Sequence, residues 1–145
     1  MEKNKIKQII LLTLIIYCIL SILRSSGLLY LAYTDTYFYN FDFNPKLLMQ
    51  KYPIYNNTYY VFPYLMGVII AIGLRWIINT NWLSLLLSIC AAFILFRFID
   101  SNFIRPIFVV FENSRENILV HLFTFFVILG ILIFFSKGVL QKKQL

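Results

Sequence analysis

The chain has 145 residues, 61% of them hydrophobic, and its mean hydropathy is +0.79. Soluble domains are only about 45–50% apolar, and a domain of this size buries about 60–70% of its surface, so a water-soluble core is excluded. The net charge of +7 does not indicate nucleic-acid binding, because lysines cluster at the two ends of the chain, at the edges of apolar segments. We therefore predict an integral membrane protein that binds no nucleic acid.

Four apolar segments have about the 20 residues that a helix needs to cross a bilayer. They are residues 6–26, 60–78, 82–98 and 114–136. The sequence thus predicts an all-α integral membrane protein with a single domain, residues 1–145, built as a four-transmembrane-helix bundle. The first segment has the basic start of a signal peptide, but the residues from Arg24 to Gly27 lack a small-x-small cleavage pattern. We expect a retained anchor.

The distribution of basic residues predicts that both termini are cytoplasmic (N-in/C-in). In this orientation, Glu2 is the only acidic residue on the cytoplasmic side. The basic tail, residues 137–145, lies on the same side. Trp76 and Trp82 flank the short turn after the second segment, as expected at a headgroup boundary. Small size and the lack of eukaryotic sorting signals favour a bacterial cytoplasmic membrane, which the chain would cross several times. The basic residues gathered inside are Lys3, Lys5, Lys7, Arg75, Lys137, Lys142 and Lys143.

The two outer loops are predicted to lie at the membrane interface. Nine of the ten tyrosines fall between Tyr30 and Tyr64, within or beside the loop 27–59, and tyrosine prefers an apolar surface with water nearby. Asn44 followed by proline is typical of a helix start, so we expect a short amphipathic helix over residues 45–51. The second outer loop, 99–113, holds an apolar run too short to span.

Small residues at steps of four predict where the helices pack, because they permit close approach in lipid. Gly67 and Ala71 form one such face, and Ser84, Ser88 and Ala92 form another. We expect these two faces to meet in a tight hairpin. The first segment carries a polar stripe that should face inward or towards another subunit, either as a packing surface or as a pore lining. Its members are Thr13, Tyr17, Ser21 and Ser25.

The fourth segment contains His121, the only histidine of the chain. Ionisable residues inside a membrane are costly and are functional candidates by default. Residues that share its helix face or its expected depth form a predicted polar patch near the outer surface, which could bind a headgroup, a small ligand or a partner. Alternatively, the side chains of His121 and Arg97 could extend to the outer interface and serve only as membrane anchors. The predicted patch consists of Arg97, His121, Asn117, Thr124, Tyr64 and Ser21.

The remaining residues offer little for catalysis. A single histidine and two cysteines in different segments make no convincing metal site or thiol pair, so we expect no catalytic residue, no metal and no cofactor. The sequence predicts a non-enzymatic protein that acts through contacts, as a membrane sensor, an immunity or defence component, or an accessory subunit. Its expected partners are membrane lipid and either further copies of itself or a protein encoded nearby. The alternatives are a subunit of a homo-oligomeric pore and a small intramembrane enzyme or redox subunit.

Overall fold

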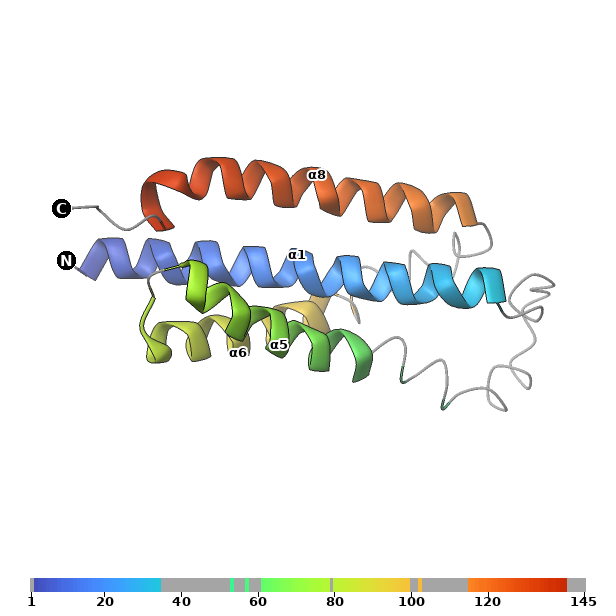
Figure 1. Cartoon of the computed structure of the whole chain (residues 1–145), viewed down its shortest axis with the longest axis horizontal. Coiled ribbons are helices and arrows are strands. Elements are labelled where there is room, and N and C mark those ends of the chain that lie inside the picture. Colours follow the sequence, from blue (N-terminus) through green and yellow to red (C-terminus); the bar gives the residue numbers. More distant parts are fainter. Residues whose placement is uncertain are drawn as a thin grey trace.

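The computed structural model describes residues 2–34, 61–78, 80–99 and 115–140, together with Pro53, Asn57 and Asn102. Four helices account for nearly all of these residues (Figure 1), and the described ranges contain no strand. The predicted helix 45–51, most of both outer loops and the last five residues of the tail lie outside the described residues. The all-helical, four-helix architecture predicted from the sequence is confirmed. In chain order the helices are α1 (Glu2–Thr34), α5 (Phe62–Ile77), α6 (Trp82–Ile99) and α8 (Arg115–Leu140).

Helix α1 is the central element of the bundle. It packs along α8 on one side and along α5 and α6 on the other (Figure 1). The direct contact between α5 and α6 is sparse, and no extensive contact joins α8 to either of them in the part of the chain that the structure describes. The fold is therefore organised by one long helix that the other three cover.

Three of the helices are long and apolar enough to cross a membrane, over Asn4–Tyr30, Trp82–Ile99 and Ile118–Ser136. Helix α5 is also apolar but has only 16 residues, or about 24 Å at 1.5 Å per residue, against about 30 Å for a hydrocarbon core. Helix α1 has 33 residues and extends beyond the predicted span 6–26 at both ends. A helix can continue past the hydrocarbon wherever no breaker stops it, and the first proline of the chain is Pro45.

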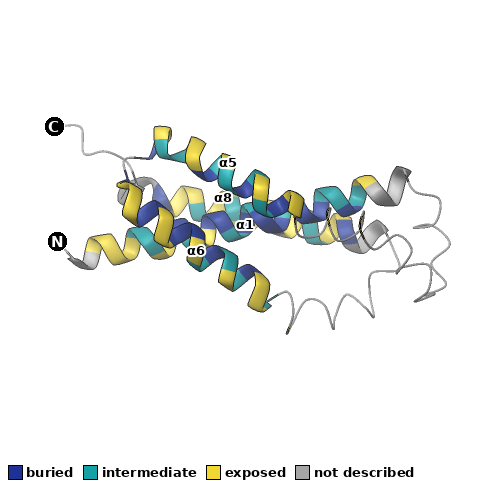
Figure 2. Ribbon diagram, turned by 90° about the horizontal axis from the view of Figure 1, so that it is seen from below, coloured by how far each residue is buried: buried dark blue, intermediate teal, exposed yellow. Residues whose placement is uncertain are grey.

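The outer surfaces of the helices are apolar, as Figure 2 shows by the exposed residues along α5, α6 and α8. Helix α8 is the extreme case, because only 11% of the apolar 18-residue window within Ile118–Ser136 is buried inside the bundle. A helix that is apolar all round and still exposed is suited to lipid. The fold and this surface define the class of the molecule, a helical-bundle membrane protein. Large exposed side chains include Leu86, Ile94, Phe123, Phe134 and Phe135.

The small-residue faces of α5 and α6 both pack against α1. A Cβ atom added to Gly67 would lie 2.5 Å from Cδ2 of Leu20, and the Ser88 hydroxyl donates to the backbone oxygens of Ser84 (2.8 Å) and of Ile9 on α1 (3.3 Å). This arrangement differs from the expected hairpin, in which the two faces would chiefly meet each other. The long α1 supplies apolar surface to both helices at once, and the core unites Ile16, Leu20, Ala71, Leu85, Ile89, Ala92 and Phe96.

The turn between α5 and α6 lies at the same end of the bundle as the first turn of α1 and the last turn of α8 (Figure 1). Asn81 caps α6, because its Oδ1 accepts a hydrogen bond from the backbone nitrogen of Ser84 at 2.7 Å. The Arg75 guanidinium stacks over the Trp82 ring, with its carbon 3.9 Å from the ring centroid. These contacts fix the end of the bundle where the predicted cytoplasmic basic residues gather.

Candidate functional site

The most unusual residue of the fold is Arg24, in the C-terminal half of α1. Its side chain is 1% exposed and is the largest fully buried side chain among the described residues. The guanidinium carbon lies 4.8 Å from the centroid of the Phe96 ring on α6, which is a cation–π distance. A charged group inside a bundle of apolar helices is costly unless its surroundings compensate it, so the neighbours of Arg24 define the candidate site.

The next residue of α1 links the site to α8. The Ser25 hydroxyl, 3% exposed, lies 3.2 Å from Nδ1 of His121, within hydrogen-bonding distance. The site thus places a permanent cation, a hydroxyl and a proton-carrying ring together at one level of the bundle.

Ser21 completes the polar part of the site. It precedes Arg24 by three residues and therefore lies on the same face of α1. Its side chain is 0% exposed, and its Oγ has no hydrogen-bond partner in the part of the chain that the structure describes. A buried hydroxyl that makes no hydrogen bond is destabilising by about 1–3 kcal/mol. The same hydroxyl can donate a hydrogen bond to a ligand that reaches it. We call the buried residues Ser21, Arg24 and Ser25, together with the half-buried His121, the buried polar cluster.

Aromatic rings from all four helices surround this cluster. Tyr17 on α1 lies edge-on between Phe96 of α6, at 6.2 Å between ring centroids, and Phe125 of α8, at 5.9 Å. Tyr64 of α5 contacts Phe96 at 5.6 Å, and the His121 ring lies 4.7 Å from that of Phe125. Such edge-to-face pairs are favourable beyond the area that they bury. These rings form an aromatic shell that packs against the buried polar cluster.

The structure brings together some members of the predicted patch and separates others. Ser21 and His121 belong to the buried polar cluster, and Tyr64 belongs to its aromatic shell. Arg97 is exposed on α6. Thr124 is exposed on α8, where its hydroxyl donates to the backbone oxygen of Val120 at 2.8 Å. Asn117 lies in α8, but its side chain is outside the described residues.

The polar stripe of the first segment faces the interior of the protomer. Ser21 and Ser25 are fully enclosed, and Tyr17 is held between two phenylalanine rings. Thr13 uses its hydroxyl within its own helix, donating to the backbone oxygen of Ile9 at 2.8 Å. The stripe is therefore a packing surface within one chain, continuous with the buried polar cluster.

Sequence reasoning missed Arg24, which it used only to argue against cleavage after the first segment. A signal was nevertheless present. Arg24 follows Tyr17 by seven residues and Ser21 by three, so it lies on the same helical face as the polar stripe. Helix α1 continues to Thr34, beyond the predicted end of the first segment, and carries Arg24 inside the bundle.

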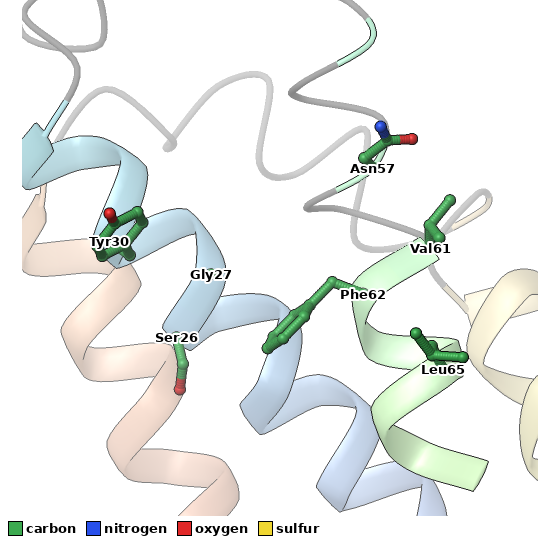
Figure 3. Close-up of a pocket in the computed structure, with 7 residues that line it drawn as sticks. All are labelled: Ser26, Gly27, Tyr30, Asn57, Val61, Phe62 and Leu65. Carbon is green, nitrogen blue, oxygen red and sulfur yellow. The ribbon is translucent and has the colours of Figure 1, made fainter. Parts of the chain in front are cut away.

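A second feature is a pocket of about 530 Å³ between α1 and the start of α5 (Figure 3). The Phe62 ring extends from α5 towards α1, and Gly27 leaves space on the facing helix. The pocket opens at the end of the bundle opposite the α5–α6 turn. Its walls are mostly apolar, and it is lined by Ser26, Gly27, Tyr30, Asn57, Val61, Phe62 and Leu65.

No group of three or more His, Cys, Asp or Glu side chains that could hold a metal ion occurs among the described residues. Comparison of the chain with protein-family models, with curated proteins and with solved structures found no match.

Proposed function

We propose that this protein is a non-enzymatic membrane protein that works by contact, recognising a ligand or partner at the end of the bundle that holds the buried polar cluster. All four helices cross the membrane in this proposal, both termini are cytoplasmic, and the membrane is a bacterial-type cytoplasmic membrane. The role is that of a sensor, an immunity or defence component, or an accessory subunit of a membrane complex. Lipid and either a second copy or a separately encoded protein are the partners.

The observation that carries the proposal is the burial of Arg24 at 1% exposure. An arginine that only anchored a helix would extend to the interface, as long basic side chains do. Arg24 is instead enclosed with Ser25 and His121, an arrangement that helix packing alone does not require and that membrane proteins retain for recognition or transport.

The orientation is supported by the arrangement of the helix ends. The start of α1, the α5–α6 turn and the end of α8 lie together (Figure 1), and this end carries Lys5, Lys7 and Arg75. Short basic flanks favour the cytoplasmic side. Helix α5 is short for a span, and a bilayer accommodates such a helix by local thinning at a modest cost.

A pore is less well supported than a contact protein. A homo-oligomeric pore would expose the polar stripe of α1 to a lumen between subunits, whereas Ser21 and Ser25 are 0% and 3% exposed within a single chain.

Site-specific photo-crosslinking in native membranes tests the proposal. A photoreactive residue at Tyr30, 68% exposed beside the pocket, should form a discrete adduct that is lost when His121 is changed to Ala. The matched position is Trp76, 88% exposed at the opposite end of the bundle, where the adduct pattern should not depend on His121. Adducts at Tyr30 that are identical with and without His121 would contradict recognition through the cluster.

A further inference from the structure

We propose that the buried polar cluster binds an acidic group, a carboxylate or a phosphate, of a small ligand that enters from the outer half of the bundle. This inference rests on the proposed function and names the ligand chemistry of the same site. The ligand could be the headgroup of an anionic lipid or a free anion, which share this chemistry.

The charge of the site selects an anion. Arg24 is the only charged side chain that is buried among the described residues, and a guanidinium matches the paired oxygens of a carboxylate or phosphate. In a medium of low dielectric constant, this attraction is stronger than in water. A cationic ligand would be repelled by the same group, and a neutral ligand would gain no charge–charge attraction.

Hydroxyl groups next to Arg24 supply further hydrogen bonds. Ser21 Oγ is fully buried and has no partner among the described atoms, and Ser25 Oγ is already aligned with His121 Nδ1 at 3.2 Å. An acidic oxygen that reached Arg24 would give the Ser21 hydroxyl an acceptor on the same face of α1. Such a hydrogen bond would satisfy the buried Ser21 hydroxyl.

Access to the cluster follows from the helix packing. Helices α6 and α8 both cover the polar face of α1, through Phe96 and Phe125, yet no extensive contact joins them to each other. A ligand that enters between the two helices would therefore displace mainly their ring contacts with Tyr17 of α1. Because Arg24 is 1% exposed, entry requires displacement of at least one ring of the aromatic shell.

The single histidine of the chain provides a direct reporter of the site. The full chain, isotopically labelled in histidine, is placed in nanodiscs of phosphatidylcholine, and the imidazole signals of His121 are followed by NMR. One arm replaces increasing fractions of the lipid by phosphatidylglycerol, and a second arm adds sodium phosphate or acetate to the neutral nanodiscs. We expect a saturable shift in one arm, and the arm that responds identifies the source of the acidic group.

Matched variants separate binding at the site from a general effect of charge. Arg24→Gln should weaken the response about tenfold or more, as expected for loss of a charged hydrogen-bond donor, and Arg24→Lys should retain part of it. Arg97→Gln removes the same charge from the residue next to Phe96, where the side chain is exposed, and should leave the response unchanged. Resistance of the buried Cys18 thiol to alkylation shows whether each variant is folded.

Three results would overturn the inference. They are an absence of any saturable shift in the unaltered protein, an equal effect of Arg24→Gln and Arg97→Gln, and an unchanged response in folded Arg24→Lys and Arg24→Gln proteins. If Arg24→Gln does not fold, the comparison of Arg24→Lys with Arg97→Gln decides. These results could overturn the anion site while the Tyr30 adduct still depends on His121. In that case the proposed contact function stands, and the site recognises a protein segment instead of an acidic group.

Discussion

The hydroxyl of Ser25 on α1 lies 3.2 Å from Nδ1 of His121 on α8. This is a polar link between two helices that also meet through aromatic side chains such as Tyr17 and Phe125. It sets the register of α8 along α1, because moving α8 by one turn would shift His121 by about 5.4 Å and break the hydrogen bond.

Removing either partner of this link should weaken the bundle. We expect Ser25→Ala and His121→Ala each to be destabilising, and the double variant to cost less than the sum of the two. The coupling should be about 0.5–1.5 kcal/mol, the range for membrane and protein hydrogen bonds. The free energy of unfolding of all four proteins is measured in mixed micelles, with alkylation of the buried Cys18 thiol as the signal of unfolding. Strictly additive effects would show that the two side chains do not interact.

Gly67 should tolerate a large side chain poorly, because it packs directly against Leu20 of α1. An added Cβ would lie 2.5 Å from Cδ2 of Leu20, which is itself fully buried. We expect Gly67→Leu to cost at least about 1–3 kcal/mol through overpacking. The matched variant is Gly73→Leu on the same helix, where an added Cβ meets no atom within 4 Å. Equal stability of the two variants would be inconsistent with the α1–α5 contact.

Asn81 should matter more for α6 than its exposed position suggests. Its Oδ1 accepts the Ser84 backbone N–H at 2.7 Å, so Asn81→Ala leaves that donor without its cap. We expect a loss of about 1 kcal/mol, with Asn81→Ser or Asn81→Asp retaining most of the stability. Equilibrium unfolding of the three variants provides the measurement, and an Asn81→Ala protein as stable as the others would argue against the cap.

The burial of the α1 stripe predicts that the protein forms no ion-conducting pore. Reconstituted into liposomes, the chain should release no entrapped ions or dye above the level of empty vesicles. Ser21 is 0% exposed, so Ser21→Leu should lower stability through overpacking, by about 1–3 kcal/mol, without any change in flux. Conductance that Ser21→Leu abolishes in a stable protein would instead support the pore.

Much of the fold could be predicted from hydropathy, because a bilayer imposes a segment length on each span. The four helices correspond to the four apolar segments, and the small residues Gly67, Ser88 and Ala92 lie at contacts within the bundle. The partner of these positions could not be predicted. A spacing of four identifies a helix face but not the helix that it meets, and here α1 receives both faces.

The candidate site was only partly predictable for a similar reason. His121 and Ser21 were identified because a polar residue in an apolar stretch is conspicuous. Arg24 and Arg97 both lie near the end of an apolar segment, and sequence alone does not distinguish a side chain that turns inward from one that turns outward. The structure separates them, since Arg24 is enclosed by α6 and α8 whereas Arg97 is exposed.

The central claim is that lipid surrounds these helices while Arg24 and its neighbours lie within them. Spin labels introduced singly at Leu65 on α5, Leu86 on α6 and Phe123 on α8, all exposed, test it in reconstituted bilayers. The account predicts that their relaxation responds strongly to oxygen, which dissolves in hydrocarbon, and weakly to a water-soluble nickel chelate, whereas a label at Ser21 responds to neither. Strong nickel accessibility at Leu65, Leu86 and Phe123 would contradict it.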